Sequence, residues 1–178
     1  RAVWAAALVG SLLALQCVYR QGYGIGQWQF LRGSQARAEY LSRQRVTYGL
    51  PDYAAAAWIN AHTAPDAKVL LVGESRGLYQ ERDFVAATVY DANPFWAAAA
   101  AAPDADGLRR RLAELGVTHL LVSVRGLFFR YDSAVVLPRE TAGGAVVDGF
   151  VGRWLDKVWE DREDAGEQPR WLVVYELR

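Results

Sequence analysis

The feature that most constrains this chain is an uncharged, apolar run near its beginning, over residues 2–19. An α-helix rises about 1.5 Å per residue, so this run spans about 27 Å, close to the roughly 30 Å hydrocarbon core of a bilayer. Arg1 and Arg20 bracket the run. Aromatic residues typical of membrane interfaces follow: Tyr19, Tyr23 and Trp28. The sequence therefore predicts a transmembrane helix over residues 1–20. A buried core helix and a secretory signal peptide are the alternatives, although no small-x-small cleavage site follows cleanly.

The orientation of this helix is ambiguous from local charge. Five arginines follow the apolar run: Arg20, Arg32, Arg37, Arg43 and Arg45. The positive-inside rule would place them in the cytoplasm, but long C-terminal domains also translocate despite their charge. The chain starts at Arg1 and contains no methionine, so we expect it to be a fragment of a longer protein.

The composition excludes several classes of function. Lys and Arg number 20, as do Asp and Glu, so nothing favours a nucleic-acid partner. The single cysteine, Cys17, excludes an internal disulfide and a multi-cysteine metal site. Two histidines leave little room for a histidine-based metal site. We therefore expect neither a metal nor a cofactor.

Residues 21–51 are predicted to connect the membrane helix to a soluble domain. Glycines at residues 22–26 are spaced GxGxG and follow a membrane helix, which is not the strand–GxGxxG–helix context of a dinucleotide site. Ser34 is predicted to cap a short helix that runs to about Arg45.

Residues 52–178 alternate between apolar runs and amphipathic stretches, the pattern of an α/β domain. Four runs predict strands: residues 68–72, 84–89, 118–124 and 171–177. Four stretches predict helices: residues 53–62, 93–102, 104–115, and a last one with Val147, Val151, Trp154 and Val158 that ends in the charged residues 160–164. A short helix is predicted over residues 125–131 and a loop over 138–144. This order predicts a small three-layer, mostly parallel, Rossmann-like sheet of about four strands.

Polar residues and a glycine mark the predicted ends of these helices. Asp52 and Asn93 are predicted N-caps, and a proline follows Asn93 at the first helical position. Asp104 or Asp106 opens the next helix, and Gly116 ends it.

One loop carries the sharpest motif of the chain. Gly-Glu-Ser-Arg-Gly at residues 73–77 follows the predicted strand 68–72 and matches the GxSxG pattern of a nucleophile elbow. Ser75 also looks superficially like the nucleophile of GDSL-class serine esterases. Such enzymes need a histidine base, and only His62 and His119 are present. In a parallel sheet His119 and Ser75 lie at opposite ends, so hydrolysis is the weaker interpretation.

The same loop has a second interpretation as a binding site. It lies at the carboxyl end of a central strand, where open α/β sheets bind ligands. Glu74, Arg76, Tyr79 and Arg82 are the candidate binding residues. Arg76 could hold an anionic or sugar-phosphate group through two parallel hydrogen bonds. Alternatively, Glu74 and Arg76 form an internal network that fixes the loop.

An ordered set of short motifs runs through most of the chain: Tyr53-x4-Trp58-Ile59-Asn60, Pro65-Asp66-Ala67-Lys68-Val69-Leu70, Gly73-Glu74-x-Arg76-Gly77-x-Tyr79, Asp91-x-Asn93-Pro94 and Leu115-Gly116-Val117-Thr118-His119. After a membrane span and a connector rich in Tyr and Arg, this set resembles the C-terminal part of bacterial polytopic membrane proteins of the glycosyltransferase 39 / dolichyl-phosphate-mannose–protein mannosyltransferase-like (GT-C) group. In that group the sugar donor is linked to a lipid phosphate, and the catalytic acidic residue lies in an early extracytoplasmic loop. That loop is not in this sequence, so the resemblance assigns no catalytic residue here.

The resemblance implies that the chain is the last membrane helix and soluble accessory domain of such a glycosyltransferase. The implied location is the bacterial inner membrane, with the soluble domain outside the cytoplasm. The implied partners are the lipid bilayer, the other transmembrane helices of the parent protein, and a polyprenyl-phosphate sugar or its acceptor. The alternatives are a non-enzymatic, membrane-anchored α/β interaction module and, more weakly, a membrane-tethered serine hydrolase that uses Ser75.

Overall fold

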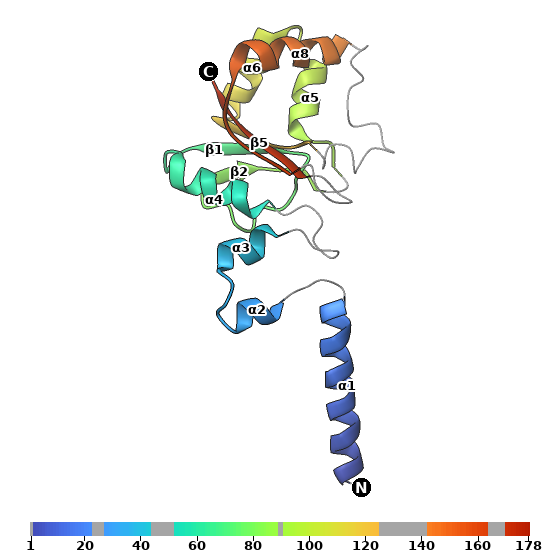
Figure 1. The fold of residues 1–178 in the computed structure, drawn as a ribbon. Helices are drawn as coiled ribbons and strands as arrows, with labels where there is room; N and C mark the ends of the chain where they lie inside the picture. The colour runs from blue at the N-terminus through green and yellow to red at the C-terminus, as the bar shows by residue number, and fades with distance from the viewer. Residues whose placement is uncertain (1, 23–26, 44–51, 89–90, 125–141, 164–169) are drawn as a thin grey trace. The chain divides into compact units, whose positions relative to one another are not determined.

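The computed structural model describes residues 2–22, 27–43, 52–88, 91–124, 142–163 and 170–178 (Figure 1). The chain divides into two compact units, Arg1–Pro51 and Asp52–Arg178. The described helices of the first unit are α1 (Ala2–Gly22), α2 (Gln27–Leu31) and α3 (Arg37–Ser42). The described helices of the second unit are α4 (Tyr53–His62), α5 (Pro94–Ala101), α6 (Ala105–Glu114) and α8 (Ala142–Trp154). Its strands are β1 (Lys68–Val72), β2 (Asp83–Val85), β3 (His119–Ser123), β4 (Leu155–Glu163) and β5 (Arg170–Leu177).

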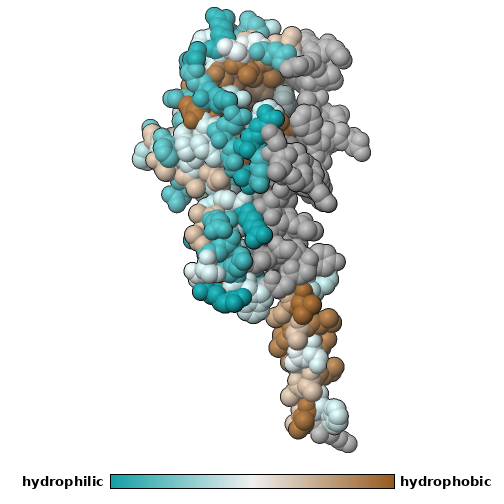
Figure 2. Space-filling view, viewed as in Figure 1, coloured by the Kyte–Doolittle hydropathy of each residue, from teal (hydrophilic) through white to brown (hydrophobic). Residues whose placement is uncertain are grey.

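Helix α1 confirms the predicted N-terminal apolar helix. Its segment Ala2–Tyr19 has a mean hydropathy of 1.8, and 0% of it is buried inside the structure. Figure 2 shows it largely in the brown of hydrophobic residues. The Ser11 hydroxyl donates to the Ala7 carbonyl at 2.9 Å, which satisfies the group inside the helix. By length and composition α1 can cross a membrane, a property that anchors share with signal sequences.

Helix α2 ends in a Schellman motif. The Gly33 N–H donates to the Phe30 carbonyl, and the Ser34 N–H donates to the Gln29 carbonyl. Gly33 has a φ of 73°, a conformation that favours glycine. The Ser34 hydroxyl also donates to the Gln29 carbonyl, at 2.9 Å. Ser34 therefore closes α2 instead of capping α3, and the predicted capping role is wrong.

The N-cap of α3 is Ala36, which has no side-chain cap. Helix α3 ends at Ser42, earlier than expected, and Arg45 lies outside the described residues. The predicted helix over residues 125–131 also lies outside them. Of the predicted loop over residues 138–144, the last three residues belong to α8.

The domain contains a five-stranded sheet in the order β2-β1-β3-β5-β4. Strand β1 is parallel to β2 and β3, with Val69 opposite His119. Strand β5 runs antiparallel to β3, with Leu121 opposite Val174, and β4 runs antiparallel to β5. The α/β class is confirmed, but the sheet is mixed. The expected mostly parallel, Rossmann-like sheet of about four strands is therefore corrected in strand number and direction.

The additional strand, β4, lies where the spacing of apolar residues predicts a continued helix. Helix α8 ends at Trp154, and β4 begins at the next residue. Val151 and Val158, assigned to the helical stripe, are 38% and 36% exposed, whereas Val146 and Phe150 reach the core. Pairing along the whole of β5 outweighs the local helical spacing. Because β4 is an edge strand, its many charged side chains protect the open edge from pairing with other chains.

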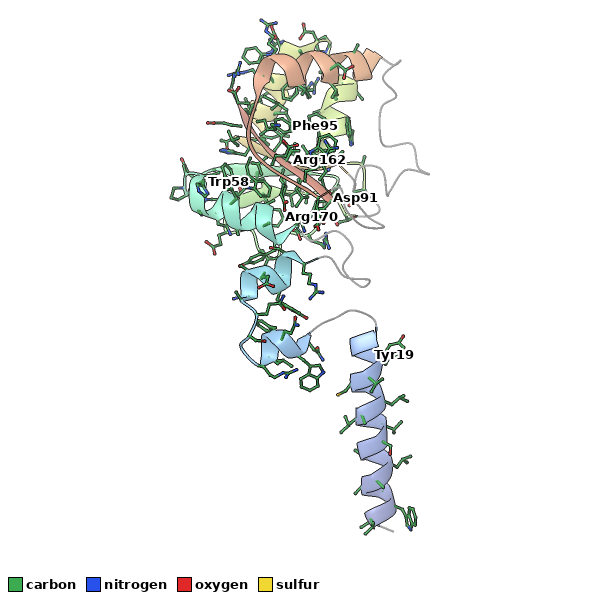
Figure 3. The ribbon with its side chains drawn as sticks, viewed as in Figure 1. Tyr19, Trp58, Asp91, Phe95, Arg162 and Arg170 are labelled. Carbon is green, nitrogen blue, oxygen red and sulfur yellow. The ribbon has the colours of Figure 1, made fainter. Side chains whose placement is uncertain are left out.

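The helices cover the two faces of the sheet unequally. On one face, α4 packs Ala55 and Ile59 against Val69 and Leu71 of β1. On the other face, α5, α6 and α8 pack together over the sheet (Figure 1). The residues that build this second core include Leu70, Val72, Phe95, Leu108, Leu112, Leu120 and Phe150. Figure 3 labels Trp58 of α4 and Phe95 of α5 on these two faces.

The predicted ends of α5 and α6 are confirmed. The Asn93 carboxamide accepts from the Phe95 N–H at 3.0 Å and donates to the Leu71 carbonyl at 2.8 Å, so it also joins α5 to β1. Asp104 accepts from the N–H three residues later, at 2.7 Å. Gly116 follows α6 with a φ of 75°.

Candidate functional site

Residues 73–82 join β1 to its parallel neighbour β2 without a helix. The loop must therefore carry the chain from the carboxyl end of β1 back to the amino end of β2. It contacts α4 first at Asp52, just before the helix, and then at Asn60 and Thr63, near its end. The loop thus runs alongside α4 from its start to its end, and the polar side chains of both segments hold them together.

Glu74 and Arg76 form a tight ion pair at the carboxyl end of β1. One oxygen of Glu74, Oε1, accepts from the N–H groups of Ser75 (2.8 Å) and Arg76 (2.9 Å) and from Arg76 Nε (2.7 Å). The other, Oε2, accepts from Arg76 Nη2 at 2.5 Å. Glu74 is buried, with only 5% of its side chain exposed. The backbone donors and the guanidinium together compensate the burial of its charge.

A second buried carboxylate lies on the same guanidinium. Asp52 Oδ1 is 3.9 Å from Arg76 Nη2, and its side chain is 2% exposed. Asp52 occupies the predicted N-cap position of α4, but its side chain makes no cap hydrogen bond to the helix. The Arg76 side chain remains 39% exposed. Arg76 therefore bridges Asp52 and Glu74 with a side chain that is partly exposed.

The far end of the loop is fastened by two side chains. The Asn60 carboxamide donates to the Tyr79 carbonyl at 2.8 Å and accepts from the Glu81 N–H at 2.9 Å. Arg82 donates to the Asn60 carbonyl at 2.5 Å and to the Thr63 carbonyl at 3.0 Å. These carbonyls belong to the last turn of α4, which has no further helical N–H partners. Arg82 therefore caps α4, away from the Glu74 carboxylate.

Tyr79 packs edge-on against Tyr53, with ring centroids 5.0 Å apart and an interplanar angle of 83°.

Gly77, the second glycine of the GxSxG motif, lies against the ring of Phe84: a Cβ atom at Gly77 would be 2.0 Å from Phe84 Cζ. A side chain at this position would require the Phe84 ring, which is 38% exposed, to move. The structure thus brings together two of the four candidate binding residues, Glu74 and Arg76. The other two, Tyr79 and Arg82, contact α4 instead.

The surroundings of Ser75 differ from a nucleophile elbow. That motif places its serine on a strained turn between a strand and a helix. Here no helix follows within residues 73–82, and every positive φ among the described residues belongs to glycine. His119 pairs with Val69 at the start of β1, whereas Ser75 follows the end of β1. His62 ends the helix that precedes β1, and its Nδ1 lies 2.8 Å from the Trp58 carbonyl.

His119 has a structural environment. Its Nδ1 lies 2.9 Å from the Thr118 hydroxyl oxygen, and it pairs with Glu176 across β3 and β5. Burial lowers the pKa of His119 below 6.5, and the nearby Glu176 carboxylate opposes this shift only in part. The folded domain therefore favours the neutral imidazole.

Sequence reasoning missed the role of Asp52 and Asn60, the two residues that hold the loop from the side of α4. Asp52 stands before a helix and so resembles an N-cap. Asn60 offered a weak signal, because asparagine is a poor helix former and its presence inside a helix suggests a side-chain partner. The contacts join Asp52 to Arg76 and Asn60 to the far end of the loop, and no local pattern reveals pairs so distant in the sequence.

Within the described ranges, no group of three or more His, Cys, Asp or Glu side chains is arranged to hold a metal ion. Comparison of the chain with protein-family models, curated proteins and solved structures finds no match.

Proposed function

We propose that this chain is the membrane anchor and non-catalytic accessory domain of a glycosyltransferase that uses a polyprenyl-phosphate-linked sugar. The observation that carries the non-catalytic role is the state of the 73–82 loop. Three of its charged groups, Glu74, Arg76 and Arg82, are already bound to one another or to α4. Such groups stabilise a surface, but none is held ready to transfer a proton to a substrate.

The uncovered surface of α1 supports the membrane anchor. Its apolar side chains find no partner within the described structure, and a bilayer or neighbouring membrane helices would bury them. The motif resemblance supports the glycosyltransferase assignment and, with it, an extracytoplasmic domain in the bacterial inner membrane. The other membrane helices of the parent protein would then pack against α1.

Arg76, whose side chain is 39% exposed, is the candidate contact for an anionic group. A phosphate or carboxylate would meet a guanidinium that Glu74 already orients. Glu74, Arg76 and Tyr79 would form the rim of such a site at the carboxyl end of β1. Because Glu74 also competes for the guanidinium, we expect weak binding that adjusts the position of the donor or acceptor.

The test uses the parent protein with the sequence that precedes Arg1 restored. The proposal predicts further membrane spans and an acidic extracytoplasmic loop upstream, and sugar transfer from a polyprenyl-phosphate donor in membranes. Deletion of residues 52–178 should lower the rate without removing the catalytic residue, and Ser75→Ala should leave the rate nearly unchanged. An upstream sequence without spans would favour the interaction module instead. Labelling of Ser75 by a fluorophosphonate probe would favour the hydrolase.

A further inference from the structure

The chain between α1 and α2 is too short to let α2 leave the neighbourhood of α1. Helix α1 ends at Gly22 and α2 begins at Gln27. At no more than about 3.6 Å per residue, the connection reaches at most about 18 Å. If α1 spans a bilayer, as the proposed function states, α2 begins within that distance of the headgroups whatever the relative orientation of the two helices.

The α2–α3 pair leaves an apolar face uncovered. Phe30 of α2 stacks on Tyr40 of α3, with ring centroids 4.9 Å apart and an interplanar angle of 16°. This contact holds the two short helices together. Trp28 and Leu31 lie three positions apart in α2 and are 41% and 62% exposed. A tryptophan beside an aliphatic side chain is typical of a helix that lies in a membrane interface.

Most of the charged side chains in the α2–α3 segment are arginines. Arg32, Arg37 and Arg43 are exposed, and none has an ion-pair partner within the described part of the chain. Glu39, the acidic residue of α3, accepts from the Gln35 carboxamide at 2.9 Å. The α2–α3 segment therefore presents three exposed guanidinium groups without an ion-pair partner among the described residues, against one carboxylate.

We propose that the α2–α3 pair lies on the membrane surface, inserts Trp28 and Leu31 between lipid headgroups, and binds the phosphates of anionic lipids through Arg32, Arg37 and Arg43. The proposal rests on the membrane anchoring of α1. Guanidinium groups suit phosphate because they donate parallel hydrogen bonds as well as charge. The surface would also hold the start of the α/β domain close to the bilayer.

The experiment places single spin labels on the full 178-residue chain in phosphatidylcholine vesicles, with and without phosphatidylglycerol. A label on the native Cys17 reports whether α1 lies in lipid. In a Cys17→Ser background, labels at Leu31→Cys and Leu78→Cys compare two exposed leucines, of which Leu78, in the 73–82 loop, is 82% exposed. We expect the label at position 31 to contact lipid-soluble oxygen and the label at position 78 to contact a water-soluble relaxing agent.

Charge is tested by replacing Arg32, Arg37 and Arg43 together with Gln. Each arginine near an anionic surface contributes about a fivefold preference for the bound state. In phosphatidylglycerol vesicles, the triple variant should therefore have a ratio of membrane-bound to unbound α2–α3 pair that is about a hundredfold lower. Added salt should also lower this ratio. The matched control replaces Arg110 and Arg111, two exposed arginines of α6, and should change nothing.

The label positions separate the two proposals. Cys17 in water would overturn the membrane anchor. Cys17 in lipid with position 31 in water would overturn the surface contact while leaving the anchor intact. A buried position 31 that responds to neither the arginines nor phosphatidylglycerol would overturn the headgroup contact and indicate that protein covers the face.

Discussion

In the α/β domain most of the described arginines lie against a partner, whereas in the α2–α3 connector they do not. The partnered arginines of the domain include Arg76, Arg82, Arg109, Arg153, Arg170 and Arg178. Arg170, labelled in Figure 3, is 13% exposed and lies 3.0 Å from Asp161. In the connector Arg32, Arg37 and Arg43 face outward without ion pairs within the described residues.

The difference shows that arginine side chains have two roles in this chain. A guanidinium that satisfies buried carboxylates is part of the fold, because its removal leaves a charge without compensation. A fully exposed guanidinium contributes little to stability and remains free to act on the surroundings. Arg76, which is paired with two buried carboxylates, should therefore contribute to folding of the domain, whereas the connector arginines should act on contact with the environment.

The largest effect should come from separating the two regions. The full chain should require detergent or lipid, whereas a fragment that begins near Leu50 should be soluble and folded, because the apolar surface of α1 is then absent. Size-exclusion chromatography with light scattering measures the oligomeric state of the full chain and of the fragment. A monodisperse, monomeric full chain without detergent would contradict the membrane assignment.

Arg76→Ala should lower the stability of the domain by about 1–3 kcal/mol, nearer the lower value because the side chain is 39% exposed. The loss arises because Glu74 and Asp52 stay buried without their shared cation. Thermal unfolding of the fragment measures it, with Arg110→Ala as the exposed control. A normal melting temperature together with lost activity of the parent enzyme would show instead that Arg76 serves a ligand.

His119 should make stability depend on pH by a smaller amount. Its folded pKa lies below 6.5, so as pH falls through about 6.5 the unfolded chain binds a proton that the folded domain resists. This contribution is complete above that pH and is lost as pH falls toward the folded pKa. Denaturant unfolding at a series of pH values gives the free energy of unfolding as a function of pH. For His119→Gln this free energy should fall less steeply at acidic pH than for the unchanged protein. For Glu176→Gln the fall should be steeper, because the carboxylate that raises the His119 pKa is gone. The same pH dependence for the unchanged protein and both variants would contradict the role given to His119.

The smallest effect should come from the connector. Replacing Arg32, Arg37 and Arg43 with Gln should change the free energy of unfolding of the domain by no more than about 0.5 kcal/mol. Thermal unfolding of the full chain in detergent measures this. A large change would mean that these arginines belong to the fold, and the comparison between the two regions would fail.

Local signals predicted much of this fold. The caps at Asn93 and Asp104, the helix α4 and the strands β1 and β3 all follow from residues within a few positions of one another. Each of these elements carries its own start signal or apolar run, so tertiary contacts reinforce what the local sequence already favours.

Long-range pairing decided the rest. The strand character of residues 155–163 depends on pairing with β5, and β5 itself is antiparallel to both of its neighbours. In the candidate site, the Glu74–Arg76 pair is local and was weighed from the sequence. Asp52 and Asn60 approach the loop only once α4 has packed on the sheet, so their role was not readable in advance.

The position of β5 has a consequence for synthesis of the protein. Residues 170–177 lie between β3 and β4, in the interior of the sheet. During translation the ribosome releases β1, β2, β3 and β4 before this strand, and β4 then has no neighbour to pair with. Until β5 pairs with β3, that edge of β3 has no partner strand, and core side chains that pack against β5 lack its contacts. Loss of a few residues from β5, by premature termination or proteolysis, would return the domain to that nascent state and mark it for chaperones and degradation.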